Sequence, residues 1–159
     1  MHDPVTFYST NGRLQPPVRQ GTIGSNAFDL QASLVNPIEI PPLSRRRIQT
    51  GLAIDFVGDY HGLIIPRSGQ ADKYGITVLN APGLVDTDYQ GEIAVILYNS
   101  NPSTTVVIEP DEWIAQILIQ RNTAPNYIFM EDGPTYEEWL ASSATSRGTN
   151  GFGSTDNKA

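Results

Sequence analysis

The sequence predicts an all-β protein built around one domain. Short apolar runs are separated by turn signals at intervals of roughly 8–12 residues, a spacing typical of a sandwich or barrel. The 14 glycines and 12 prolines that punctuate these runs argue against a helical bundle. A chain of 159 residues is long enough to bury a hydrophobic core of its own.

The expected elements follow from these runs and turns. In chain order the strands are residues 5–8, 28–34, 38–40, 45–50, 52–56, 62–65, 76–79, 91–98, 104–108 and 113–120. Ser68–Tyr74 is expected to form one short helix, because it lacks β-branched residues and ends at Gly75.

The strand at residues 91–98 is apolar on both faces. Its alternating side chains are Ile93, Val95 and Leu97 on one face and Ala94, Ile96 and Tyr98 on the other. A strand buried on both sides in a small antiparallel fold must contact something beyond its own sheet. A subunit interface is the simplest candidate, and burial within the chain is the alternative.

Composition excludes several functions. A net charge of −7 argues against general nucleic-acid binding, which needs a basic face. The absence of cysteine removes disulfides, thiolate nucleophiles and cysteine-based metal sites. Because His2 and His61 are the only histidines in the sequence, a general acid or base that works near neutral pH is expected to be a carboxylate. Neither a signal peptide nor an apolar run of about 18 residues occurs, so we expect a cytoplasmic protein without a membrane partner.

The composition changes at residue 142, where a tail rich in Ser, Thr, Gly and Asn begins. Phe152 is its only large apolar residue, so the tail cannot offset its own ordering entropy. We therefore expect a domain over residues 1–141 and a flexible arm over residues 142–159. The arm has the composition to close over an anionic ligand, and a frayed terminus is the alternative.

Three segments carry residues suited to nucleotide chemistry. Arg67, Ser68 and Gly69 supply a guanidinium, a hydroxyl and backbone N–H groups at a strand-to-helix junction, a set suited to phosphate. In the loop over residues 80–91, the Asn80 amide suits a pyrimidine edge, and the Asp86 carboxylate suits a general base. Gln116 lies within an apolar strand and needs hydrogen-bond partners. The alternatives are surface turns for the first two segments and a structural role for Gln116.

Five segments in order resemble the motifs of the trimeric dUTPase family, and together they extend from Ala27 to Thr155. They are residues 27–32, 66–69, 83–91, 114–116 and 147–155. The resemblance implies a β-clip or jelly-roll barrel and a homotrimer with shared active sites. It also implies Mg²⁺-dependent hydrolysis of dUTP to dUMP and pyrophosphate by water attack on the α-phosphate. That activity limits uracil incorporation into DNA and supplies dUMP.

The resemblance also implies residue roles. Asp86 matches the catalytic carboxylate that activates water, and Tyr89 matches the ring that packs under deoxyribose. Asp29 matches a carboxylate near the metal through water, with Mg²⁺ held mainly by substrate phosphates. The remaining substrate-binding positions are Asn80, Gly83, Leu84 and Val85 for uracil, Arg67, Ser68, Gly69 and Gln116 for phosphate, and Arg147, Phe152, Gly153, Ser154 and Thr155 on the arm. Within the arm, Phe152 matches the residue that stacks on uracil.

Some positions depart from the family pattern. Ala27 stands where the family usually has Gly, Ala94 where Lys is frequent, and Asp156 where a terminal Gly is frequent. Asp111-Glu112-Trp113 replaces a common Gly-Asp/Glu-Arg. Two rival functions are a dCTP deaminase of related fold and a catalytically inactive family member that serves as a binding module. The second would be expected to have lost Asp86 or the arm, and this chain has both.

Overall fold

The computed structural model describes residues 5–12, 18–56, 58–122 and 135–142. The chain divides into two compact units, Met1–Thr123 and Ala124–Ala159. Within the second unit the described element is the helix α2 (Tyr136–Ser142). The first unit contains β1 (Val5–Ser9), β2 (Val18–Gln20), β3 (Ala27–Gln31), β4 (Ile38–Ile40), β5 (Arg45–Gln49), β6 (Leu52–Phe56), β7 (Tyr60–Pro66), α1 (Ser68–Tyr74), β8 (Ile76–Val78), β9 (Gly83–Val85), β10 (Ala94–Asn99), β11 (Val106–Ile108) and β12 (Trp113–Arg121).

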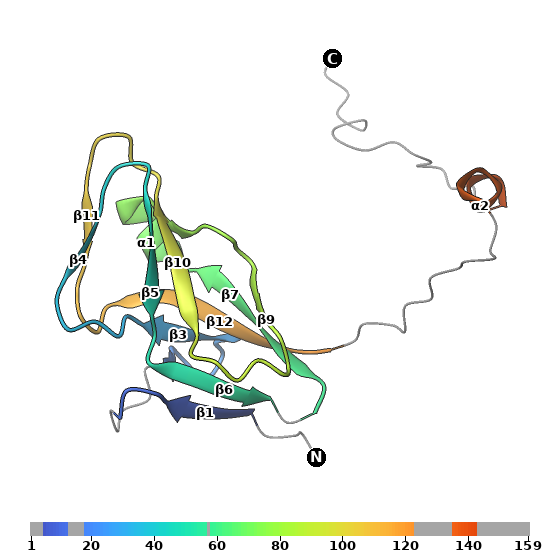
Figure 1. Ribbon diagram of the computed structural model, residues 1–159, viewed down its shortest axis with the longest axis horizontal. Helices are drawn as coiled ribbons and strands as arrows, with labels where there is room; N and C mark the ends of the chain where they lie inside the picture. Colours follow the sequence, from blue (N-terminus) through green and yellow to red (C-terminus); the bar gives the residue numbers. More distant parts are fainter. Residues whose placement is uncertain (1–4, 13–17, 57, 123–134, 143–159) are drawn as a thin grey trace. The chain divides into compact units, whose positions relative to one another are not determined.

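The strands form four antiparallel sheets. The largest has five strands in the order β2-β3-β12-β7-β9, and a three-stranded sheet has the order β5-β10-β8. Two further pairs are β1-β6 and β11-β4. In Figure 1, β1 and β6 lie at the bottom of the first unit and β4 and β11 at its left.

The core is formed by the inward faces of these sheets. On β6, Leu52, Ile54 and Phe56 are buried while Asp55 is exposed, which is the alternation expected of a half-buried strand. Val95 and Leu97 on β10 join the same apolar cluster. Each such side chain contributes about 1.5–3 kcal/mol on burial. The four sheets therefore share one hydrophobic core.

The second face of β10 is only half-buried. Ala94, Ile96 and Tyr98 point away from the core and are partly exposed in the single chain. They lie opposite Gln49, Arg47 and Arg45 of β5, respectively. One apolar face of β10 is therefore buried in the core, whereas the other apolar face is partly exposed to solvent in the single chain.

The predicted all-β class is confirmed in part, since the described residues are mostly in strands and form two short helices instead of the one expected, and several elements match their predicted bounds. β4, β6 and α1 begin and end where the sequence predicted them. β10 begins at Ala94 rather than at residue 91. The Ile93 N–H donates to the Leu52 carbonyl, and the Ile93 carbonyl accepts from the Thr50 N–H, so Ile93 is not part of the regular β10 ladder. The patterns did not predict β2, β9 or α2, which are three to seven residues long.

The helix α2 begins with a capping box. The backbone N–H of Thr135 donates to the Glu138 carboxylate at 2.7 Å, and the Glu138 N–H donates to the Thr135 hydroxyl at 3.3 Å. The hydrogen bonds from the Thr135 backbone and hydroxyl lower the pKa of Glu138 below its ordinary value. Neither described helix is long and apolar enough to cross a membrane.

Candidate active site

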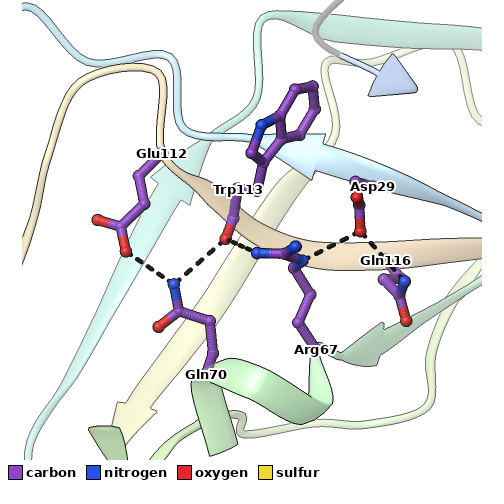
Figure 2. Close-up of polar contacts among 6 residues, drawn as sticks. All are labelled: Asp29, Arg67, Gln70, Glu112, Trp113 and Gln116. Atoms are coloured by element: carbon purple, nitrogen blue, oxygen red, sulfur yellow. Dashed lines mark hydrogen bonds and ion pairs between the residues drawn. The ribbon is translucent and has the colours of Figure 1, made fainter. Parts of the chain in front are cut away.

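A buried carboxylate organises the phosphate-side residues. Asp29 on β3 is 6% exposed, and its Oδ1 accepts hydrogen bonds from Arg67 Nε at 3.0 Å and from Gln116 Nε2 at 3.1 Å (Figure 2). Asp29 and Gln116 are directly opposite each other on β3 and β12, so their side chains share one face of the sheet. The ion pair and the sheet register together bring three predicted site residues into contact. We name Asp29, Arg67 and Gln116 the phosphate-side cluster, after the role that the family resemblance implies for them.

Arg67 lies at the junction of β7 and α1, as the sequence predicted. Its Nη1 donates to the Trp113 carbonyl at 2.9 Å, so two neighbouring strands hold its guanidinium. Ser68 and Gly69 follow in the first turn of α1, where backbone N–H groups have no intrahelical partner. A side chain at Gly69 would meet no atom within 4 Å, so the space beside this turn is open.

A second group of predicted residues lines a cavity of about 200 Å³. Asn80, Asp86 and Tyr89 contribute polar and aromatic groups, and Gly83, Leu84, Val85, Ile64, Ile93 and Ala94 line the rest. The volume is below the roughly 300–1,000 Å³ of sites that enclose a drug-sized ligand, so the cavity has room for only a small group. We name it the nucleoside cavity, after the role that the family resemblance implies for its residues.

Backbone contacts shape the nucleoside cavity. The Tyr89 hydroxyl donates to the Glu92 carbonyl at 3.0 Å, and the Glu92 carboxylate accepts from the Gly51 N–H at 2.8 Å. Gly91 leaves room for the Tyr89 ring, since a Cβ there would lie 2.5 Å from the Tyr89 hydroxyl. Asn80 folds over Gly83, whose Cβ would meet the Asn80 amide nitrogen at 3.1 Å. The cavity is therefore held by turns and backbone groups.

Asp86 of the nucleoside cavity and Arg67 of the phosphate-side cluster lie near opposite ends of β7, whereas Ile64 at the middle of β7 also lines the cavity. Val85 is opposite Gly62, and Asp86 follows Val85, whereas Arg67 follows Pro66 at the other end of the strand. The step from Gly62 to Pro66 corresponds to about 13 Å at roughly 3.3 Å per residue. The backbone positions of Asp86 and Arg67 in one chain are therefore well separated along β7.

The remaining predicted residues lie outside the described part of the chain. They are Arg147, Phe152, Gly153, Ser154 and Thr155. Among the described residues, no three or more His, Asp or Glu side chains are grouped so that they could hold a metal ion.

Comparison with known proteins identifies the family. The family model described as dUTPase matches residues 16–156, which is most of the chain. The chain belongs to the dUTPase family. A deoxyuridine 5'-triphosphate nucleotidohydrolase of Chlamydia muridarum is 42% identical over 134 residues, covering 84% of this chain and 86% of that relative.

Solved dUTPases share the fold. The dUTPase of Staphylococcus bacteriophage 80alpha with dUPNHPP matches at a TM-score of 0.75 and 19% identity, over 96% of this chain and 98% of the other. A mutant dUTPase of phage phi11 of S. aureus, whose structure reveals a structural Mg(II) ion, matches at 0.70 and 16% identity, over 82% and 98%.

Several residues that contribute to the site could not be predicted from the sequence. Ile64 and Ile93 line the nucleoside cavity, yet they look like ordinary core residues in the sequence. Gln70 and Glu112 hydrogen bond to each other beside the phosphate-side cluster across 42 positions of sequence. Glu112 occupies the Asp/Glu position of the family pattern, between the departures at Asp111 and Trp113, and nothing in the sequence singled out Gln70.

Proposed function

We propose that this chain is a dUTP diphosphatase, which hydrolyses dUTP to dUMP and pyrophosphate. The observation that carries the proposal is the convergence of an amide, a carboxylate and an aromatic ring, from Asn80, Asp86 and Tyr89, on one cavity. Family membership supplies the substrate class. The alternative, a dCTP deaminase, would need groups that deaminate cytosine and a site that accepts its amino group. The Asp86 carboxylate and the phosphate-side cluster instead favour hydrolysis at phosphorus.

The nucleoside cavity would select the base and the sugar. The Asn80 amide both donates and accepts, as the edge of uracil requires, and the backbone of Gly83, Leu84 and Val85 completes the pairing. Cytosine would leave these groups unpaired. The Tyr89 ring would pack under deoxyribose and leave no room for a 2′-hydroxyl.

Asp86 would act as the general base. It accepts a proton from a water molecule while the water oxygen bonds to the α-phosphorus in line with the leaving group. The bond between the α-phosphorus and the bridging oxygen breaks, and pyrophosphate leaves with that electron pair. Arg67, Gln116 and the N–H groups of Ser68 and Gly69 would stabilise the phosphate charge, so catalysis is mainly positioning and electrostatics.

Mg²⁺ is the cofactor that we propose for this reaction. Asp29 is the carboxylate of the phosphate-side cluster, and its Oδ1 already accepts from Arg67 and Gln116. A single carboxylate whose oxygen is already hydrogen-bonded fits an ion that takes most of its ligands from water and substrate phosphates. Asp29 would hold the ion through water. When bound, Mg²⁺ neutralises part of the phosphate charge.

A complete site would combine two copies of the chain. The roughly 13 Å between the ends of β7 keeps Asp86 and Arg67 of one chain apart. A neighbouring copy can supply the phosphate-side cluster to the nucleoside cavity, and the half-exposed face of Ala94, Ile96 and Tyr98 supports an interface beside that cavity. We therefore propose a homotrimer with shared active sites, in which a closed β-clip or jelly-roll barrel forms each subunit.

The arm over residues 142–159 would act as a lid. Phe152 would stack on uracil, while Arg147, Ser154 and Thr155 would contact the γ-phosphate, and Gly153 would bind substrate beside them. Ordering such a polar segment costs conformational entropy, so closure would require the complete triphosphate.

Turnover of dUTP with Mg²⁺ tests the proposed function directly. Purified protein should release pyrophosphate and dUMP from dUTP, with much slower turnover of UTP and dCTP. Release of ammonia from dCTP, or an absence of turnover with dUTP, would contradict the proposal.

Mixing two inactive variants tests the shared site. In a trimer, Asp86→Asn and Arg67→Ala subunits place a normal Asp86 beside a normal Arg67 in about a quarter of the sites after random 1:1 assembly. Co-refolded mixtures should therefore regain activity that neither variant has alone. Activity that stays at the level of the separate variants would contradict a site shared between subunits.

A further inference from the structure

The Trp113 carbonyl is a shared acceptor beside the phosphate-side cluster. Arg67 Nη1 donates to it at 2.9 Å, and Gln70 Nε2 donates at 3.3 Å (Figure 2). Arg67 Nε is bound to Asp29, so the guanidinium is fixed at a carboxylate on β3 and at this carbonyl on β12. The direction of its other N–H groups depends on where the carbonyl lies, because the guanidinium is planar and rigid.

Glu112 fixes the chain immediately before that carbonyl. Its Oε1 accepts from Gln70 Nε2 at 2.7 Å, and its Oε2 accepts from the Glu109 N–H at 2.9 Å. The Glu112 N–H also donates to the Glu109 carbonyl at 3.2 Å. The turn from β11 into β12 is thus closed twice, and Gln70 joins it to α1.

Gln70 is an unusual residue for its surroundings. It is 6% exposed, and its Oε1 has no hydrogen-bond partner among the described residues. A buried acceptor without a partner loses its hydration without compensation, whereas an apolar side chain of similar size would avoid that loss. The contribution of this side chain to stability therefore does not explain why an amide is present. The two hydrogen bonds that Gln70 Nε2 donates, to Glu112 and to the Trp113 carbonyl, do explain it.

We propose that Gln70 and Glu112 are positioning residues that orient Arg67 toward the substrate phosphates. They act through the Trp113 carbonyl and do not touch the substrate. The inference rests on the proposed function, since that function assigns Arg67 to phosphate. It also gives a role to Glu112, which lies in a segment where the chain departs from the family pattern.

Gln70→Met tests the proposal by removing both Nε2 bonds while keeping the length of the side chain. Affinity for a non-hydrolysable dUTP analogue, measured by calorimetry on the full chain with Mg²⁺, should fall about five- to tenfold, as for lost hydrogen bonds of ordinary net strength. Affinity for deoxyuridine, which has no phosphate, and the melting temperature should stay at wild-type values. Gln120→Met, at an exposed position near the end of β12, is the matched control and should behave as wild type.

The outcomes separate this inference from the proposed function. Unchanged analogue affinity in Gln70→Met would overturn the inference, and so would an equal loss of both ligands with a lower melting temperature, which indicates a merely structural role. Absence of dUTP turnover in the wild-type protein would instead overturn the proposed function.

An exchange of the two side chains gives a second test. Gln70→Glu places two carboxylates together and should weaken analogue binding more than Gln70→Met does. Adding Glu112→Gln restores an N–H···O bond between the two positions, so the double variant should bind the analogue more tightly than Gln70→Glu alone. If the second substitution restores no affinity, the two residues do not act as a pair and the proposal is wrong.

Discussion

Asp29 in the phosphate-side cluster is 6% exposed, whereas Tyr89 in the nucleoside cavity is 46% exposed. The first is fixed by side chains, through hydrogen bonds from Arg67 and Gln116. The second is fixed by backbone groups, since its hydroxyl donates to the Glu92 carbonyl and its N–H to the Asp86 carbonyl. Substitutions in the phosphate-side cluster should therefore affect folding and binding together, and substitutions around the nucleoside cavity should affect turnover and specificity with little change in stability.

The largest effect is expected for Asp86→Asn. Loss of a positioned general base typically slows turnover by about 10²–10⁴-fold. Asp86 is exposed in the single chain, so the melting temperature and the affinity for a non-hydrolysable dUTP analogue should stay close to wild type. Steady-state kinetics, thermal melts and calorimetry measure the three quantities.

Asp88→Asn is the matched control for that variant. Asp88 is exposed on the same turn but does not line the nucleoside cavity. Its turnover should remain near wild type. A similar kcat for Asp86→Asn and Asp88→Asn would remove Asp86 from its catalytic role.

Arg67→Met should show the opposite behaviour, with a measurable loss of stability. It leaves the buried Asp29 carboxylate without its cationic partner, and hydrogen bonds to charged groups contribute about 1.5–3 kcal/mol. We expect the free energy of unfolding to fall by about 2 kcal/mol, because Arg67 itself is 28% exposed and partly screened. Urea unfolding measures the change. Arg121→Met, at an exposed position on β12, should lower stability by much less, and equal losses in the two variants would contradict the comparison.

Local patterns predicted much of the fold. β6 follows from the short apolar run that begins after Gly51, and α1 ends where Gly75 adopts a left-handed conformation with φ of 62°. The sequence pattern did not predict β9, because the three residues that follow Pro82 look like part of a turn. Only their pairing with β7 makes them a strand. Tertiary hydrogen bonds of this kind have no signature in a single sequence.

The site was predictable in its residue types and less so in its contacts. Arg67, Asp86 and Asn80 were singled out by chemistry and by the family resemblance. The bond from Gln116 to Asp29 spans 87 positions, and the sequence alone could not pair them. The separation of Asp86 from Arg67 along β7 likewise depends on the register of β7 with β9, which the turn residues did not reveal.

The smallest effect is expected for Gly91→Ala, which tests whether backbone packing alone places the Tyr89 ring. The added Cβ would lie 2.5 Å from the Tyr89 hydroxyl and 2.7 Å from Cζ, so the ring must move and its bond to Glu92 must break. Because the ring is half-exposed, it can move without disturbing the core, and the melting temperature should change little. A displaced ring no longer fills the space of a 2′-hydroxyl, so the preference for dUTP over UTP in kcat/KM should fall roughly tenfold. Gly24→Ala is the control, since a Cβ there meets no atom within 4 Å. If Gly91→Ala kept the full preference for dUTP while turning over normally, the position of the Tyr89 ring would not decide sugar selection, and the nucleoside cavity would have to select the sugar through other groups.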